Sequence, residues 1–297
     1  MGMLTFTAQL SLDFLFGGVK QLPNSGEEVL SDSFSIQLGG GTLVYPVVLT
    51  RLGADCRVIL KKSDSLQSNL AYSLLRECGI QEITALPVDF DPVMTTAVIS
   101  QAHDRSFVAH NDPRAFAFDD DFLFESLRSS RVVFATEQNA GLIPRLKREG
   151  CTIVFDVGWS EDLSLEKYAG VLRQVDYFTP NDKEALKLTG AADVQESLAI
   201  LRRYVPYPIV SCGADGCMTV LDGSILHIPV PKGIHAVDTT GAGDNFMAGL
   251  IYAVSQGMPV ADCVKFAACT GSLSTTALGC YGAAYTLEDV RRLLRTY

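Results

Sequence analysis

The chain has little tryptophan, a single residue, and its eight cysteines form no Cys-x-x-Cys pair. In a chain of 297 residues this scatter favours free thiols in a reducing compartment over a disulfide framework. The sequence also lacks a basic N-terminal region followed by an apolar core, and no apolar run approaches the length of a membrane span. These absences predict a cytoplasmic protein.

Positive charge is also scarce, with 24 Lys and Arg residues against 34 Asp and Glu and a formal net charge of −10. Non-specific nucleic-acid binding relies on basic patches, so this balance argues against it. A phosphate-bearing substrate is still allowed, because backbone N–H groups and metal ions can offset the field locally. The phosphate-loop pattern Gly-x-x-x-x-Gly-Lys-Ser/Thr occurs nowhere, which excludes a P-loop kinase.

The composition that remains is that of an ordinary globular protein, with 47% hydrophobic and 20% charged residues. Its length allows one large α/β domain or two smaller ones. Strand-like and helix-like segments alternate from residue 58 onward, which favours βαβ units and a mostly parallel sheet. The segments are 58–60, 69–78, 132–135, 143–149, 152–156, 161–174 and 177–179.

Three stretches with alternating apolar and polar residues interrupt this pattern, at 29–38, 95–100 and 105–109. Alternation predicts half-buried strands, and strands so far apart in the sequence suggest a small β-sheet that projects from the main body. The opening stretch, 4–10, is expected to be a strand with Asp13 just beyond it. A carboxylate beyond the carboxyl end of a strand lies where α/β sheets usually bind ligands.

The most informative stretch is Val237 to Asp244, which precedes an apolar-periodic run at 245–255. Gly241 and Gly243 leave the backbone free to turn and expose its N–H groups, and the following helix directs its positive end at the same point. Such donors, from Gly241, Ala242 and Gly243, could stabilise a phosphoryl group in transfer while Asp244 takes the proton from an attacking hydroxyl. The alternative is that Asp244 only favours the helix dipole and the glycines only form a loop.

Two further motifs have structural explanations beside functional ones. Asn181 and Glu184 have the spacing of a capping box at the start of a helix, and Thr286 and Asp289 have the same spacing near the C-terminus. The stretch 209–216 reads as a buried strand that enters a glycine turn, which is compatible with a plain hairpin.

The string Asp-Thr-Thr-Gly-Ala-Gly-Asp at 238–244 resembles the C-terminal signature of the PfkB, or ribokinase-like, family of sugar and nucleoside kinases. The resemblance covers nearly the whole chain in order. It implies a three-layer α/β/α fold with a mostly parallel central sheet and a small β-sheet lid. It further implies one kinase domain over 1–297, with lid strands inserted at about 15–38 and 93–112. The lid is often a dimer surface in this family, so a homodimer through the lid is one assembly that the resemblance allows.

The resemblance also implies the substrate contacts. Asp13 matches an early Asp that binds two sugar hydroxyls. The glycines at 39–41 match the N-terminal signature, with Gly40 and Gly41 as substrate contacts. Glu137 matches a Glu that contacts sugar in some members. Where the family usually has an Asn after this signature, the chain has Val44.

For the nucleotide and metals, the resemblance implies ATP and Mg²⁺, with Asn181 and Glu184 ordering Mg²⁺ through its waters. It places Ser211, Gly213 and Gly216 near ATP. Asp238 and Thr240 match positions that often help to hold a monovalent cation, here K⁺. Mg²⁺ prefers such hard oxygen ligands.

The sequence therefore predicts an ATP-dependent carbohydrate kinase that phosphorylates a hydroxyl, expected to be primary, of a small sugar or sugar derivative. One alternative is a nucleoside kinase of the same fold, whose base pocket would be lined by apolar residues such as Leu12, Phe14, Phe16 and Phe107. The other is a non-catalytic nucleotide or sugar sensor. Its support is Val44 and the stretch 157–159, which replaces an Asn and an Arg that many sugar kinases carry there.

Overall fold

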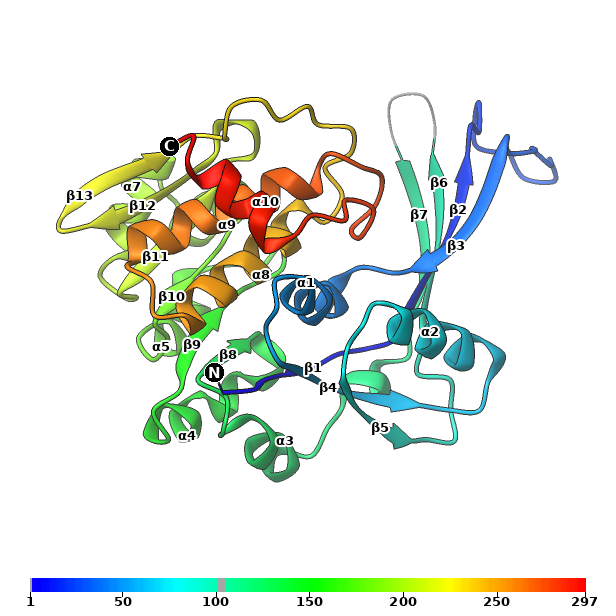
Figure 1. Ribbon diagram of the computed structural model, residues 1–297, viewed down its shortest axis with the longest axis horizontal. Helices are drawn as coiled ribbons and strands as arrows, with labels where there is room; N and C mark the ends of the chain where they lie inside the picture. The colour runs from blue at the N-terminus through cyan, green and yellow to red at the C-terminus, as the bar shows by residue number, and fades with distance from the viewer. Residues whose placement is uncertain (1, 101–104) are drawn as a thin grey trace. The chain divides into compact units, whose positions relative to one another are not determined.

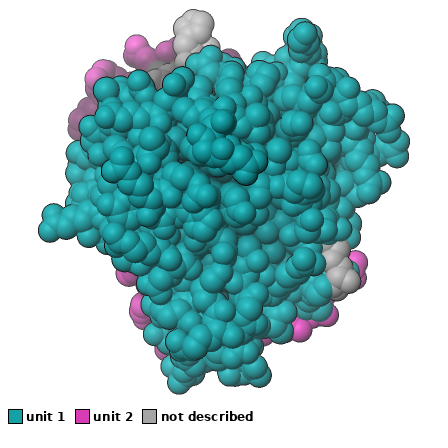
Figure 2. All heavy atoms as spheres, turned by 90° about the vertical axis from the view of Figure 1, so that its left-hand side faces the viewer, with its two compact units in different colours: residues 1–6, 48–56, 118–297 teal, residues 7–47, 57–117 magenta. Residues whose placement is uncertain are grey.

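The computed structural model describes residues 2–100 and 105–297. The chain forms two compact units (Figures 1 and 2), of which the first contains residues 1–6, 48–56 and 118–297 and the second contains residues 7–47 and 57–117. The chain passes between them several times, and the helix α1 (Val44–Arg51) runs across one of these boundaries. The expectation of a single domain stays a prediction.

The first unit is built on a six-stranded sheet with the order β13-β12-β11-β10-β9-β8. Strands β8 to β11 are parallel, and β12 and β13 extend the sheet antiparallel at one edge. The strands are β8 (Val132–Ala135), β9 (Thr152–Phe155), β10 (Tyr177–Phe178), β11 (Tyr207–Ser211), β12 (Cys217–Leu221) and β13 (Ser224–Ile228). The parallel strands are short and almost wholly buried, as expected when helices cover both faces.

Helices cover both faces of this sheet. One layer shares a buried apolar core with the strands and contains α3 (Asp120–Leu127), α4 (Ile143–Arg148), α5 (Leu165–Leu172), α6 (Asp182–Thr189) and α7 (Val194–Leu201). The opposite layer contains α8 (Ala242–Ser255), which contacts β8, and α9 (Val260–Ser274), which contacts β12 and β13, with α10 (Leu287–Leu294) packed on α9 (Figure 1). This confirms the three-layer α/β/α arrangement. Two short 3₁₀ helices, η3 (Glu137–Leu142) and η4 (Gly213–Asp215), follow strands of the sheet.

The second unit contains a four-stranded sheet with the order β3-β2-β6-β7. Its strands are β2 (Ser11–Gly17), β3 (Ser33–Leu38), β6 (Met94–Ser100) and β7 (Arg105–His110). The parallel pairing of β2 with β6 joins two antiparallel hairpin-like pairs, β2 with β3 and β6 with β7. This sheet is the small β-sheet that the sequence predicts.

The rest of the second unit is a parallel pair with a helix. The strands β4 (Cys56–Lys62) and β5 (Glu82–Pro87) pair in parallel and are joined by α2 (Leu66–Glu77), whose N-cap Ser65 accepts a hydrogen bond from the backbone N–H of Ser68. The short 3₁₀ helices η1 (Gly41–Leu43) and η2 (Pro113–Phe116) complete the unit.

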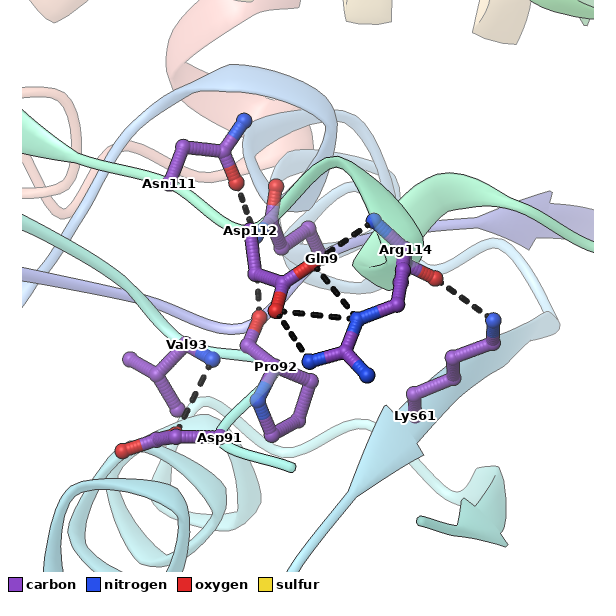
Figure 3. Close-up of polar contacts among 8 residues, drawn as sticks. All are labelled: Gln9, Lys61, Asp91, Pro92, Val93, Asn111, Asp112 and Arg114. Carbon is purple, nitrogen blue, oxygen red and sulfur yellow. Dashed lines mark hydrogen bonds and ion pairs between the residues drawn. The ribbon is translucent and has the colours of Figure 1, made fainter. Parts of the chain in front are cut away.

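The segments that enter and leave the four-stranded sheet are held together by one buried side chain (Figure 3). Gln9, which is 5% exposed, lies between β1 (Leu4–Thr7) and β2, and its Nε2 donates to the carbonyl of Pro92 at 2.9 Å and to Oδ1 of Asn111 at 2.7 Å. Pro92 precedes β6 and Asn111 follows β7, so one amide ties together three segments that are distant in the sequence.

A second group of contacts in Figure 3 fixes the segment after β7. Arg114 pairs with Asp112 at 2.6 Å, and this ion pair and its hydrogen bonds lower the pKa of Asp112 to about 2. The carbonyl of Arg114 accepts a hydrogen bond from Lys61 Nζ at 2.6 Å. The guanidinium also lies 4.0 Å from the centre of the Phe90 ring, which Figure 3 does not draw. The return from the sheet is therefore anchored on β4.

The structure corrects two of the predicted strands. The stretch 4–10 is not one strand, because β1 ends at Thr7 and β2 begins at Ser11. Asp13 consequently lies inside β2 rather than in a loop beyond a strand. Gln9 falls where the chain changes sheets, and its two hydrogen bonds there replace strand pairing. The alternation at 29–38 produces a strand only from Ser33 onward.

Other predictions are confirmed. All eight cysteines are free thiols. Both capping boxes are present, at Asn181 with Glu184 and at Thr286 with Asp289. Within the described part of the chain, no helix combines the length and the apolar character that crossing a membrane requires.

Candidate active site

The loop before α8 has the shape that the sequence predicts for an anion site. Gly241 is the N-cap of α8 and has a φ of 73°, a left-handed conformation that favours glycine. Asp244 is the third residue of the helix, in its first turn. Backbone N–H groups in a first turn have no carbonyl partner within the helix, so this end can bind an anion. Of the three expected donors, Ala242 already donates its N–H to the carbonyl of Thr239 at 3.2 Å.

Asp238 organises the same loop from within. It is 6% exposed, and its Oδ1 accepts hydrogen bonds from the backbone N–H and from Oγ1 of Thr240, both at 2.8 Å. Its Oδ2 accepts the backbone N–H of Gly279, also at 2.8 Å. One carboxylate therefore joins the loop before α8 to the loop after α9.

Asp156, in the first unit, interacts electrostatically with two other acidic side chains. Burial raises the pKa of Asp156 well above its usual value, and the negative charges of Glu184 and Asp244 raise it further. Oδ1 of Asp156 is shielded from solvent and has no hydrogen-bond partner among the residues that the structure describes. A buried carboxylate oxygen without a partner is costly, so this arrangement suits a site completed by a cation.

Glu184 and Asn181 satisfy each other's backbone at the start of α6. The N–H of Asn181 donates to Oε2 of Glu184, and the N–H of Glu184 donates to Oδ1 of Asn181, each at 2.9 Å. Glu184 is 8% exposed, and burial raises its pKa. The capping box holds the carboxyl group in place without excluding a further role for its second oxygen.

The predicted nucleotide turn is a tight connection between β11 and β12. Asn181 forms a bridge with Ser211 at the end of β11, so the capping box and the turn are neighbours. Gly213 and Gly216 both have positive φ, at 55° and 86°. A side chain at Gly216 would place its Cβ 2.1 Å from the carbonyl oxygen of Ile228, so only glycine fits here.

The expected substrate residues Asp13, Gly40 and Gly41 lie in the second unit. Burial raises the pKa of Asp13. The strand that carries Asp13 is followed, through β3, by the turn at residues 39–41, in which Gly41 has a φ of 76°. Val44, in the position of the family's Asn, is 0% exposed and therefore belongs to the apolar core.

Glu137 already has partners. Its carboxylate forms an ion pair with Lys167 at 2.9 Å and accepts a hydrogen bond from the Tyr168 hydroxyl at 2.9 Å, and these contacts lower its pKa. A substrate would have to compete with both partners for this carboxylate.

The apolar residues considered for a base pocket do not share a face with Asp13. In β2, side chains alternate between the two faces of the sheet, so Leu12, Phe14 and Phe16 lie on the face opposite Asp13. Phe107, which pairs with Val98, lies on the same face as Asp13 and is 61% exposed. Three of the four residues therefore cannot line one pocket with Asp13.

Sequence reasoning missed three residues of this region. Asp156 directly follows the buried strand β9, and the rule that singled out Asp13 could have found it. Asn245 and Tyr285, which contact each other beside Gly241, have no comparable signal, because nothing in the sequence shows that these two positions meet.

Comparison with known proteins agrees with this geometry. A family model described as "pfkB family carbohydrate kinase" matches residues 15–286. The chain is 24% identical over 311 aligned positions to a ribokinase of Lactococcus lactis, with 99% of this chain and 98% of the relative covered. It is 26% identical to an aminoimidazole riboside kinase of Salmonella typhimurium, with 87% and 88% covered.

Solved structures show the same fold. The structure of Arabidopsis thaliana ribokinase complexed with ribose and ATP matches with a TM-score of 0.84 and 20% identity, covering 100% of this chain and 99% of that one. A nucleoside kinase of Methanocaldococcus jannaschii matches with a TM-score of 0.79 and 18% identity, covering 100% and 99%.

The fold and the matched family define a phosphotransferase of the ribokinase type. The chain belongs to the pfkB family of carbohydrate kinases, and the predicted enzyme class, an ATP-dependent carbohydrate kinase, is confirmed.

Proposed function

We propose that this kinase transfers the γ-phosphoryl group of ATP to a hydroxyl, expected to be primary, of a small sugar or sugar derivative. The observation that carries the proposal is the position of Asp244 in the first turn of α8, directly after the left-handed Gly241. A carboxylate and backbone N–H donors are thereby held on one helix end, as a base and an anion site require.

In this mechanism Asp244 accepts the proton of the attacking hydroxyl, whose oxygen forms a bond to the γ-phosphorus while the bond to the leaving ADP oxygen breaks. The N–H groups of Gly241 and Gly243 stabilise the charge on the phosphoryl oxygens. Ala242 can join them only by giving up its hydrogen bond to Thr239. Asp13 orients the acceptor by binding its hydroxyls, and Gly40, Gly41 and Glu137 are further acceptor contacts.

The residues present fit a Mg²⁺ ion. Among residues 2–100 and 105–297, no three His, Cys, Asp or Glu side chains lie close enough to hold a metal by themselves. Mg²⁺ usually keeps several waters and uses one or two carboxylates, which Glu184, with Asn181, and the partnerless Oδ1 of Asp156 can supply. When bound, Mg²⁺ would neutralise charge on the phosphates.

For the nucleotide, we propose that ATP binds at Ser211, Gly213 and Gly216. Gly213 has open space around it, whereas Gly216 packs closely against the backbone of Ile228. The loop that Asp238 and Thr240 organise is the proposed K⁺ site. Asp238 joins the loop before α8 to the loop after α9. An ion bound there would therefore contribute to holding the backbone that leads into α8.

The test is ADP release with ATP and Mg²⁺ across a panel of sugars, sugar phosphates and nucleosides, for the wild-type chain and for Asp244→Asn. The matched control is Asp262→Asn, because Asp262 is the third residue of α9 as Asp244 is of α8. If Asp244 only interacts with the helix dipole, then Asp244→Asn and Asp262→Asn should change the rate of ADP release to a similar extent. Loss of a general base should lower turnover by about 100- to 10,000-fold only in Asp244→Asn.

The same assay decides between the remaining candidates. Turnover on nucleosides in preference to sugars would establish the nucleoside kinase, the activity in the names of some relatives. Binding of ATP and a sugar without ADP release would indicate a sensor. Equal turnover in Asp244→Asn and wild type would refute the proposed base.

We further propose a cytoplasmic homodimer that pairs through the four-stranded sheet. One face of that sheet is apolar and partly exposed, with Phe34 at 55%, Ile36 at 38% and Val108 at 68%. Among the strands that the structure describes, β3 and β7 are the edges of this sheet, and each pairs on one side. Analytical ultracentrifugation should give twice the monomer mass, and Phe34→Asp should shift it toward the monomer.

A further inference from the structure

The residue after the proposed base has a side chain with no exposure to solvent and three hydrogen bonds. Asn245 is 0% exposed, and its Nδ2 donates to the carbonyl of Gly241 at 2.8 Å and to the carbonyl of Cys280 at 3.2 Å. Its Oδ1 accepts a hydrogen bond from the hydroxyl of Tyr285 at 2.6 Å. One amide therefore contacts the N-cap of α8 and two points of the loop after α9.

Chemistry fixes the orientation of this amide. The carbonyls of Gly241 and Cys280 can only accept hydrogen bonds, so the NH₂ group of Asn245 must face them. Its oxygen then faces Tyr285, whose hydroxyl must donate. Tyr285 is 6% exposed, and burial raises its pKa, so the hydroxyl keeps the proton that it donates.

The loop that Asn245 contacts lies directly against the anion site. A side chain at Gly241 would place its Cβ 2.7 Å from Sγ and 3.0 Å from Cα of Cys280. The loop is held on its other side by Arg51, whose guanidinium donates to the carbonyls of Tyr281 at 3.0 Å and Ala283 at 3.2 Å. Movement of this loop would therefore move the backbone at Gly241.

The carbonyl of Gly241 accepts two hydrogen bonds, from the backbone N–H of Asn245 at 2.9 Å and from its side chain. The second bond resists rotation of the peptide plane that joins Gly241 to Ala242. Gly241 has no side chain to restrict its backbone, so this plane depends on external contacts. The N–H of Gly243 follows this plane and the N–H of Gly241 precedes it, and these two groups are the donors of the proposed anion site.

We propose that Tyr285, acting through the amide of Asn245, is a positioning residue that holds the Gly241 backbone in the orientation required to bind the transferred phosphoryl group. The inference rests on the proposed function of the Gly241 to Asp244 loop. Neither side chain touches the substrate; both act by fixing the peptide groups that do.

The first variant is Tyr285→Phe, which removes only the hydroxyl and leaves Oδ1 of Asn245 without its donor. The matched control is Tyr252→Phe on α8, also 6% exposed, whose ring stacks on Phe266 with centroids 5.1 Å apart. For Tyr285→Phe, kcat should fall roughly tenfold or more while the KM for ATP changes less than about twofold, because misplacement affects the transition state more than ground-state binding. The control should keep the wild-type kcat.

A second measurement separates positioning from general stability. Asn245→Ala and the double variant Asn245→Ala with Tyr285→Phe complete a double-mutant cycle with thermal unfolding recorded for each. If Tyr285 acts through Asn245, the double variant should have the kcat of Asn245→Ala. Additive losses in kcat, or a lower melting temperature for Tyr285→Phe with an unchanged kcat, would overturn the proposal.

A third readout does not need an acceptor. ADP with aluminium fluoride mimics the phosphoryl group in transfer, and its affinity should fall roughly tenfold in Tyr285→Phe while the affinity for ADP alone stays unchanged. If the wild-type protein turns over substrate but Tyr285→Phe binds the mimic as tightly as wild type does, the positioning role of Tyr285 is overturned and the proposed kinase function is not. A wild-type chain that shows no turnover and binds the mimic no better than ADP would overturn the proposed function and, with it, the inference.

Discussion

Oδ1 of Asp13 lies so close to Gly39 that a methyl group at position 39 would have its carbon 2.8 Å from that oxygen and 2.1 Å from Oγ of Ser11. The backbone N–H of Gly39 donates to the carbonyl of Ser11 at 2.9 Å, which brings the two strands into this contact. Glycine is therefore required here for close approach, next to the proposed acceptor contact.

Gly39→Ala should raise the KM for the acceptor, because the new methyl group displaces the Asp13 carboxylate, and should cost about 1–3 kcal/mol of unfolding free energy through overpacking. Gly170→Ala is the control, since Gly170 lies inside α5 with open space around it and alanine there should stabilise the protein by up to about 1 kcal/mol. Urea unfolding measures the free energy of unfolding of each variant, and titration with the acceptor measures its KM. An unchanged KM in Gly39→Ala would contradict the role of Asp13.

Replacing the buried Asp156 by Asn and replacing Asp176 by Asn should have opposite effects on the stability of the protein. Asp176 is paired with Lys147 at 2.7 Å and accepts the N–H of Ile153, whereas Oδ1 of Asp156 has no partner within the described ranges. Without Mg²⁺, Asp156→Asn should unfold at a higher urea concentration than wild type, because the variant removes a buried carboxyl group whose ionisation burial disfavours. Asp176→Asn should lose about 1–3 kcal/mol.

With Mg²⁺ and substrates, the Asp156→Asn variant should need more Mg²⁺ for half-maximal ADP release, because one carboxylate that fits the ion is lost. A wild-type Mg²⁺ dependence in this variant would mean that Asp156 takes no part in the metal site.

The pH dependence of stability should report on Asp13. Because burial raises its folded-state pKa above the unfolded value near 3.9, its favourable contribution is fully present below that unfolded value and is lost as the pH rises through the folded pKa. The unfolding free energies of wild type and Asp13→Asn should therefore diverge with rising pH, with the variant gaining relative to wild type. Curves that stay parallel as the pH rises above the unfolded pKa would show that the folded pKa is not raised.

The sequence predicts best those structural features that are determined by residues close together in the chain. The helix after Asp244 follows from the apolar-periodic run at 245–255, and α8 ends at Ser255 as that run does. Capping at Asn181 with Glu184 is equally local. The left-handed turn at Gly241 follows from the need for glycine at positive φ.

Features that depend on contacts between distant segments could not be predicted in this way. The apolar pattern at 4–10 continues across a change of sheet, so it reads as one strand although two different sheets receive its ends. The charge coupling of Asp156 with Glu184 and Asp244, and the bond between Tyr285 and Asn245, arise where separate helices and loops of the first unit meet. Neither has a periodicity or a spacing in the sequence.

The contacts of Gln9 lead to a prediction about the sheet in which Asp13 lies. Gln9→Leu keeps the side chain's bulk but leaves the buried carbonyl of Pro92 and Oδ1 of Asn111 without their donor, which should cost about 1–3 kcal/mol. Gln174→Leu is the control, because Gln174 makes the same kind of bond, Nε2 to the carbonyl of Gly170 at 2.9 Å, but on the exposed surface.

Water can replace the lost partner at Gln174, so this control should stay within about 0.5 kcal/mol of wild type. Hydrogen exchange should also accelerate in β2, β6 and β7 of Gln9→Leu, since these are the strands whose entry and exit segments Gln9 joins (Figure 3). If Gln9→Leu and Gln174→Leu have equal unfolding free energies, then the strand pairing of the sheet alone is sufficient to hold these segments, and the buried amide contributes nothing to its stability.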